Sequence, residues 1–128
     1  MKKKKFNFRA RLHSFIFAGR GILVLFREEH NARIHLFIAV SVIFMGIVFD
    51  ISATEWMFCI LAIGLVLSAE AVNSSLESIA DSITLEENAH IKKAKDFAAA
   101  AVLILSISAA LVGLTIFSRP LYLLVFSK

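Results

Sequence analysis

The chain has 128 residues, room for a single domain (residues 1–128), and 59% of them are hydrophobic. Soluble domains contain about 45–50% hydrophobic residues, so this composition excludes an ordinary soluble fold. The net charge is +4, and the chain begins with a run of basic residues. Arg and His recur in the residues that follow, where a signal peptide would have a continuous apolar segment, so we expect no cleaved signal peptide. No nucleic-acid recognition module follows that start, and the single cysteine, Cys59, excludes an internal disulfide or a cysteine-rich metal cluster.

The first 32 residues have the pattern of an amphipathic helix. Arg and His residues recur on one stripe at helical spacing, and apolar residues form a separate face. The apolar face consists of Phe8, Leu12, Phe15, Gly19, Ile22 and Phe26. We therefore predict that residues 1–32 form a cytoplasmic segment whose helix lies in the membrane interface. A plain surface anchor would show the same pattern.

Three apolar stretches follow, and each is long enough to cross a bilayer once its flanking residues are included. Residues 34–49 and 97–118 contain no Asp, Glu, Lys or Arg. We predict transmembrane helices at about 33–50, 55–80 and 95–118. The fold class is therefore an all-α integral membrane protein with three transmembrane helices and an N-terminal amphipathic interfacial helix.

The loops predict the orientation of these helices. The connection at 50–55 carries no Lys or Arg, whereas the connection at 81–96 carries Lys92, Lys93 and Lys95. The positive-inside rule then places the N-terminus and the 81–96 connection in the cytoplasm. Three thin helices enclose little interior, and small residues recur on the third, so we expect the chain to form an oligomer.

Acidic residues on the second apolar helix are the strongest functional signal. At helical spacing Glu70, Asn73, Glu77 and Asp81 fall on one stripe, about 16 Å long. An acid at the centre of a membrane helix costs at least about 2.5–3.5 kcal/mol, so such residues face protein or a wet cavity. The alternative is that the polar residues only join helices and the acids only meet water beyond the span.

The residue types on this stripe suit phosphoryl transfer. Carboxylate oxygens are ligands for Mg²⁺, which is held by one or two carboxylates plus substrate phosphates. A carboxylate set deeper retains a proton more readily and can serve as a general base. Glu29, at the start of the first span, is expected at the level of Glu77, and a lysine entering the third span can neutralise phosphoryl charge. No P-loop or protein-kinase glycine motif is present, which excludes those nucleotide sites.

The segment A-E-A-V-N-S-S-L-E-S-I-A-D, followed by A-K-D at 94–96, resembles the small prokaryotic diacylglycerol kinase family, which also contains undecaprenol kinases. The resemblance covers about residues 8–117. It implies a multi-pass enzyme of the bacterial plasma membrane that uses ATP and Mg²⁺ and forms a homotrimer with shared active sites. It also implies that Glu70 is the catalytic, substrate-binding base and that Glu29 and Glu77 bind both the metal and ATP.

The resemblance also implies the remaining ATP contacts. Asn73 and Lys95 would position the phosphates, Asp81 would support the site, and Asp96 and Glu86 would hold the nucleotide. Near the N-terminus the family has an aromatic residue and an arginine against ATP. Phe17 fits the aromatic position without a tyrosine hydroxyl, and Arg9 is the arginine candidate, although Arg11 also flanks that position.

Three functions remain open on the sequence. The first is a lipid kinase acting on undecaprenol, favoured because E-E-H-N-A-R-I-H resembles that branch of the family, or on diacylglycerol. The second is a small proton-coupled transporter in which Glu70 and Asp81 form a relay. The third is a non-enzymatic membrane assembly protein whose polar stripe joins helices. We expect no nucleic-acid partner.

Overall fold

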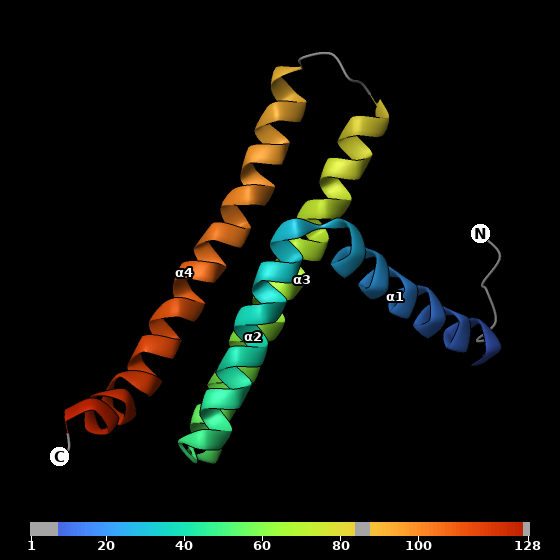
Figure 1. The fold of residues 1–128 in the computed structure, drawn as a ribbon. Helices are drawn as coiled ribbons and strands as arrows, with labels where there is room; N and C mark the ends of the chain where they lie inside the picture. The colour runs from blue at the N-terminus through green and yellow to red at the C-terminus, as the bar shows by residue number, and fades with distance from the viewer. Residues whose placement is uncertain (1–7, 84–87, 127–128) are drawn as a thin grey trace.

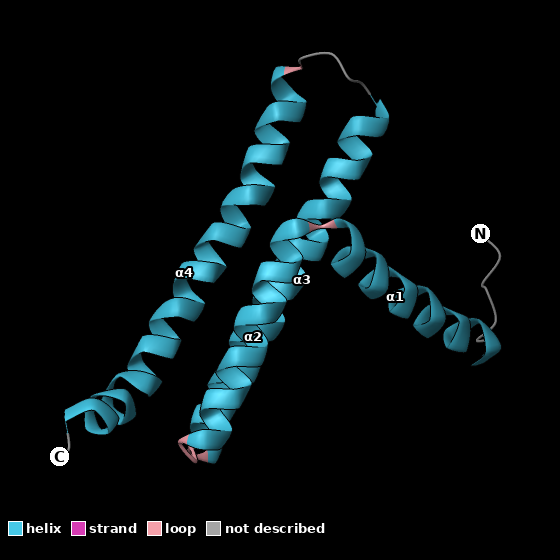
Figure 2. Cartoon of the chain, in the orientation of Figure 1, coloured by secondary structure: helices cyan, strands magenta, loops and turns pink. Residues whose placement is uncertain are grey.

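The computed structural model describes residues 8–83 and 88–126, and all of its regular structure in those residues is helical (Figure 2). The four helices are α1 (Phe8–Glu28), α2 (His30–Val48), α3 (Ala53–Ile83) and α4 (Ala89–Phe126). The last three are long and apolar enough to cross a membrane. The predicted fold class, with three spanning helices and an N-terminal amphipathic helix, is therefore confirmed.

Helix α1 leaves the other three helices at a steep angle (Figure 1). Much of its apolar face is exposed in the described chain: Phe15 is 76% exposed and Ile22 is 56% exposed. A helix with an apolar face open to its surroundings and a basic stripe is suited to the membrane interface. The chain changes direction at Glu29, whose backbone is extended (φ −92°, ψ 119°), and α2 begins at His30 rather than at 33.

Helices α3 and α4 are longer than the predicted spans. The predictions ended where charged residues appear, but a charge does not end a helix when its side chain can reach water or the interface. Helix α4 begins early because the Asn88 side chain accepts hydrogen bonds from the backbone N–H groups of His90 (2.9 Å) and Ile91 (3.2 Å). It continues past Pro120 to Phe126, and its last turns run in a different direction (Figure 1).

The turn between α2 and α3 is built from two helix caps. Asp50 adopts a left-handed backbone (φ 48°), a conformation that Asp tolerates better than most residues. The backbone N–H of Ile51 then donates to the carbonyl of Gly46 at 3.2 Å, and that of Asp50 to the carbonyl of Ile47 at 3.3 Å. Beyond it Ser52 and Glu55 form a reciprocal capping box that starts α3. These caps make α2 and α3 an antiparallel hairpin.

The apolar core gathers at this α2–α3 turn. Ile51, Cys59, Ile116 and Phe117 are buried together, and Trp56 packs against them. Cys59 is only 2% exposed, as expected for a small buried hydrophobe. Most other large apolar side chains are exposed along the helices, which is the arrangement expected when lipid or a neighbouring subunit is the surrounding medium.

Candidate functional site

The acidic stripe of α3 runs from buried to exposed along the helix. Glu70 is 2% exposed and Asn73 is 9% exposed, Glu77 is half-buried, and Asp81 is exposed. The seven-residue spacing from Glu70 to Glu77 corresponds to about 10 Å of helix. The stripe therefore provides one buried carboxylate and two shallower ones, and the burial of Glu70 fits the expectation that such acids face protein or a wet cavity.

The deep carboxylate has a partner that sequence reasoning missed. His35 of α2 places its Nε2 atom 3.2 Å from Oε1 of Glu70. Among residues 8–83 and 88–126, no other ion pair to Glu70 is formed. The signal available in the sequence was His35 itself, a titratable side chain inside an otherwise apolar span. Burying such a side chain in a membrane is costly, so these residues are often functional. The partner of His35 could not be read from the sequence, because the contact joins two helices.

The middle of the stripe offers oxygen atoms for a cation. The Asn73 amide donates through Nδ2 to Oε1 of Glu77 at 3.1 Å, which holds that carboxylate in place. The Oδ1 atom of Asn73 is buried and has no hydrogen-bond partner in the described chain. No cluster of three His, Cys, Asp or Glu residues occurs in that part of the chain. The Glu77 carboxylate and the Asn73 amide oxygen are the kinds of oxygen atom that Mg²⁺ binds, with its remaining ligands taken from phosphates and water.

Glu29 lies level with this part of the stripe. Helices α2 and α3 are antiparallel and meet at His35 and Glu70. Counting six residues along each helix from that contact brings Glu29 opposite Leu76, the residue before Glu77 in the chain. Glu29 is half-buried at the α1–α2 junction, which lies beside α3 (Figure 1), and its side chain makes no capping hydrogen bond. Its carboxylate is therefore not committed to holding the helix end.

Lys95 joins the shallow end of the stripe from α4. Its Nζ atom lies 3.0 Å from Oδ1 of Asp81. Asp96 follows it and is exposed. Lys93, in contrast, lies over the ring of Phe97, with Nζ 5.5 Å from the ring centroid. The structure thus brings one of these two lysines, Lys95, into contact with the stripe.

The two candidates on α1 lie apart from the stripe of the same chain. Phe17 and Arg9 are 12 and 20 residues before Glu29, which corresponds to about 18 and 30 Å along a helix. Phe17 is 64% exposed, and α1 points away from α3 and α4 (Figure 1). The remaining candidate, Glu86, lies outside the described residues.

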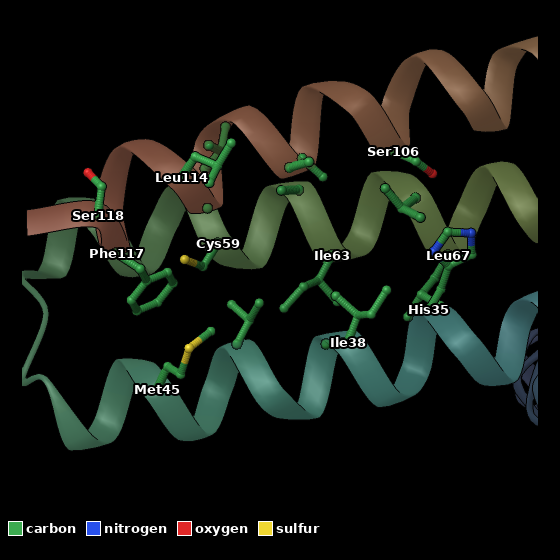
Figure 3. A pocket seen from close by; sticks show the side chains of 18 of the residues that line it. His35, Ile38, Met45, Cys59, Ile63, Leu67, Ser106, Leu114, Phe117 and Ser118 are labelled. Atoms are coloured by element: carbon green, nitrogen blue, oxygen red, sulfur yellow. The ribbon is translucent and has the colours of Figure 1, made fainter. Parts of the chain in front are cut away.

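An apolar groove of about 490 Å³ runs between α2, α3 and α4. No pattern in the sequence indicated this groove. Small residues of α4, including Ala109, Ala110 and Gly113, line it and leave it open. His35 and Ser106 lie together at one end of the groove, whereas Phe117 and Ser118 lie at the other (Figure 3). The groove is therefore apolar along most of its length, and its polar end lies beside Glu70.

Comparison with known proteins shows the family to which the chain belongs. The family model described as prokaryotic diacylglycerol kinase matches residues 16–117. The undecaprenol kinase of Bacillus subtilis is 38% identical over 104 residues, covering 81% of this chain and 85% of that protein. The diacylglycerol kinase of Synechocystis sp. is 37% identical over 112 residues, covering 86% of this chain but only 63% of that protein.

These matches favour the lipid kinase over the transporter and the assembly protein. Together with the three apolar helices they indicate a multi-pass bacterial membrane protein. The chain belongs to the prokaryotic diacylglycerol kinase family, whose members are phosphotransferases that use ATP to phosphorylate a lipid alcohol.

Proposed function

We propose that this enzyme phosphorylates undecaprenol in preference to diacylglycerol, using ATP and Mg²⁺ at the cytoplasmic side of the bacterial plasma membrane. The observation that carries the proposal is the buried Glu70 carboxylate, which contacts His35 at the polar end of an apolar groove. This arrangement suits a substrate whose single hydroxyl must meet a base while its hydrocarbon stays in an apolar medium.

The choice of acceptor rests on the polarity of the groove. Diacylglycerol carries two ester groups close to its hydroxyl, whereas the rest of the undecaprenol molecule, apart from its hydroxyl, is hydrocarbon. Near Glu70, the described lining offers just two polar side chains, His35 and Ser106. Ester carbonyls buried without partners would cost about 1–3 kcal/mol each. The similarity to the Bacillus subtilis undecaprenol kinase, which extends over 85% of that protein, supports the same acceptor.

Glu70 would act as the general base. It takes the proton of the lipid hydroxyl as the lipid oxygen forms its bond to the γ-phosphorus of ATP. The bond between that phosphorus and the β–γ bridging oxygen breaks, and its electron pair leaves on ADP. Because the protein forms no covalent bond, catalysis depends mainly on positioning and on neutralising charge.

The shallower residues would hold the phosphate donor. Glu29 and Glu77 would bind Mg²⁺, which when present neutralises part of the phosphate charge. Asn73 already holds Glu77 at 3.1 Å, and Lys95 would place its ammonium against the phosphates. Asp81 would orient Lys95 through their 3.0 Å contact, while Asp96 and Glu86 would hold the nucleotide.

We further propose that the enzyme is a homotrimer with active sites shared between subunits, and that its N-terminus is cytoplasmic. Phe17 and Arg9 lie along a helix that leaves its own bundle, so they would reach ATP in a neighbouring subunit. The orientation is supported by the lysines that precede α1 and by Lys92, Lys93 and Lys95 near the α3–α4 turn.

A side-by-side kinase assay tests the proposal. The purified enzyme is placed in lipid nanodiscs containing either undecaprenol or diacylglycerol, with labelled ATP and titrated Mg²⁺. We expect Mg²⁺-dependent labelling of both lipids, with a higher kcat/KM for undecaprenol. A higher kcat/KM for diacylglycerol would overturn the acceptor assignment, and labelling of neither lipid would overturn the function.

A further inference from the structure

We propose that the lipid hydroxyl binds between Ser106 of α4 and Glu70 of α3, and that His35 of α2 is a positioning residue that holds the Glu70 carboxylate ready for it. This inference rests on the proposed function and specifies how the acceptor is recognised. Each of the three helices that line the groove would supply one polar group at the polar end of the groove.

The first observation is the state of the Ser106 hydroxyl. Ser41, Ser108 and Thr115 all donate to the carbonyl four residues earlier, at 2.8–2.9 Å. This back-bonding is the usual way in which a hydroxyl is satisfied in a membrane helix. Ser106 Oγ is buried and makes no hydrogen bond to any residue in 8–83 or 88–126. A ligand hydroxyl would supply the missing partner and recover the cost of burying that atom.

The second observation is the level at which Ser106 lies. The contact between Lys95 and Asp81 shows which parts of the antiparallel helices α3 and α4 lie close together. Counting eleven residues from each toward the middle of its helix brings Ser106 opposite Glu70. Ser106 also lines the same groove as His35, the partner of Glu70, and both appear at the same end of it (Figure 3). The unpaired hydroxyl and the proposed base are therefore at one depth.

The third observation is the geometry of His35. Its Nε2 atom lies 3.2 Å from Oε1 of Glu70, which places one carboxylate oxygen against the imidazole and leaves the other to accept a proton. The His35 side chain is 20% exposed and lines the groove, whereas that of Glu70 is 3% exposed. His35 therefore contacts the Glu70 carboxylate from the side that faces the groove.

The roles are chemically consistent with the transfer step. Ser106 would accept or donate one hydrogen bond at the lipid oxygen without exchanging its own proton. The lipid proton would pass to the Glu70 oxygen that His35 does not occupy. The lipid oxygen would then bond to the γ-phosphorus, and ADP would leave with the electron pair of the broken bond. His35 contacts the Glu70 carboxylate, so its effect on the chemical step would pass through Glu70.

Serine variants test the acceptor contact. Ser106→Ala removes the free hydroxyl, and Ser108→Ala, two residues away and already back-bonded, is the matched control. In undecaprenol nanodiscs we expect Ser106→Ala to raise KM for the lipid about three- to tenfold, the effect of one hydrogen bond, with KM for ATP unchanged. Equal lipid KM values in both variants would overturn the contact, as would a change in oligomeric state confined to Ser106→Ala.

Histidine variants test the positioning role. Gln can place an amide N–H near the position of Nε2, whereas Leu has similar bulk and no donor. We expect His35→Leu to lower kcat at least about tenfold and His35→Gln to recover a substantial part of it, with KM for ATP unchanged in both. Equal kcat values for His35→Gln and His35→Leu would reduce His35 to packing and overturn its role. Wild-type enzyme inactive on both lipids would overturn the proposed function itself, whereas active enzyme with unaffected variants would overturn only this inference.

Discussion

Lys95 of α4 and Asp81 of α3 meet at 3.0 Å across the α3–α4 connection, at the shallow end of the acidic stripe. Both side chains are partly to largely exposed, so the ion pair adds little to stability. The pair does fix the position of the Lys95 ammonium group relative to Asn73 and Glu77. We therefore interpret the pair as a device that holds Lys95 at the phosphates.

A double-mutant cycle tests this interpretation. We expect Lys95→Met to raise KM for ATP strongly, because the transferring phosphoryl group loses its positive partner. Asp81→Asn should raise it less, since Lys95 remains charged but is no longer held. If Asp81 acts only through Lys95, the double variant will be no worse than Lys95→Met alone. Fully additive effects would show that Asp81 has a separate role, and Lys92→Met serves as the control for general loss of charge.

The sequence predicted well what depends on helical periodicity. Glu70, Asn73 and Glu77 share one face because residues three and four apart always do in a helix, and the three apolar spans follow from composition. The sequence could not predict contacts between helices. The pairing of His35 with Glu70 and the free state of Ser106 depend on helix register, and nothing local distinguishes Ser106 from the back-bonded Ser108.

The helix ends were predicted less accurately for a different reason. Span prediction detects where apolar residues stop, whereas a helix ends where its backbone finds another partner. Asn88 caps α4, which therefore begins six residues before residue 95, where the apolar pattern predicted its start. Asp50 ends α2 through its left-handed backbone. Asn and Asp are residue types that often occur at helix ends, but whether these two act as caps depends on the geometry of the turn.

Replacing Glu70 tests its role as base. Glu70→Gln keeps the shape of the side chain and can still contact His35, but it has no carboxylate to accept the proton. We expect kcat to fall about 10²- to 10⁴-fold while nucleotide binding and the unfolding transition in detergent stay close to wild type. Glu55→Gln, at the opposite end of α3, should retain full activity. Near-normal turnover by Glu70→Gln in reconstituted membranes would remove Glu70 from the chemistry.

Metal titration tests the two proposed ligands. Glu29→Gln and Glu77→Gln each remove one carboxylate charge, so we expect the Mg²⁺ concentration for half-maximal activity to rise at least about tenfold. Glu28→Gln alters the neighbouring exposed acid at the end of α1 and should leave the titration unchanged. Chelation of Mg²⁺ should abolish turnover of the wild type. A titration curve for Glu77→Gln that matches the Glu28→Gln curve would exclude Glu77 as a ligand.

The close approach of α2 to α3 beside their turn gives a prediction about stability. A Cβ atom added at Gly46 would lie 2.7 Å from Cη2 and 2.8 Å from Cζ2 of Trp56, closer than such atoms can pack. Trp56 cannot easily move away, because it packs against the buried cluster around Cys59 and Phe117. We expect Gly46→Ala to destabilise the protein by about 1–3 kcal/mol in thermal or denaturant unfolding in detergent.

Gly64→Ala is the matched control for that experiment, because a Cβ at Gly64 of α3 meets nothing within 4 Å. It should be neutral or slightly stabilising, since Ala favours a helix more than Gly does. The Gly46–Trp56 contact lies at the end of the bundle opposite the acidic stripe. The activity per folded molecule of Gly46→Ala should therefore stay close to wild type at low temperature. Loss of activity without loss of stability would mean that this end of the bundle is coupled to Glu70, a connection the present packing gives no reason to expect.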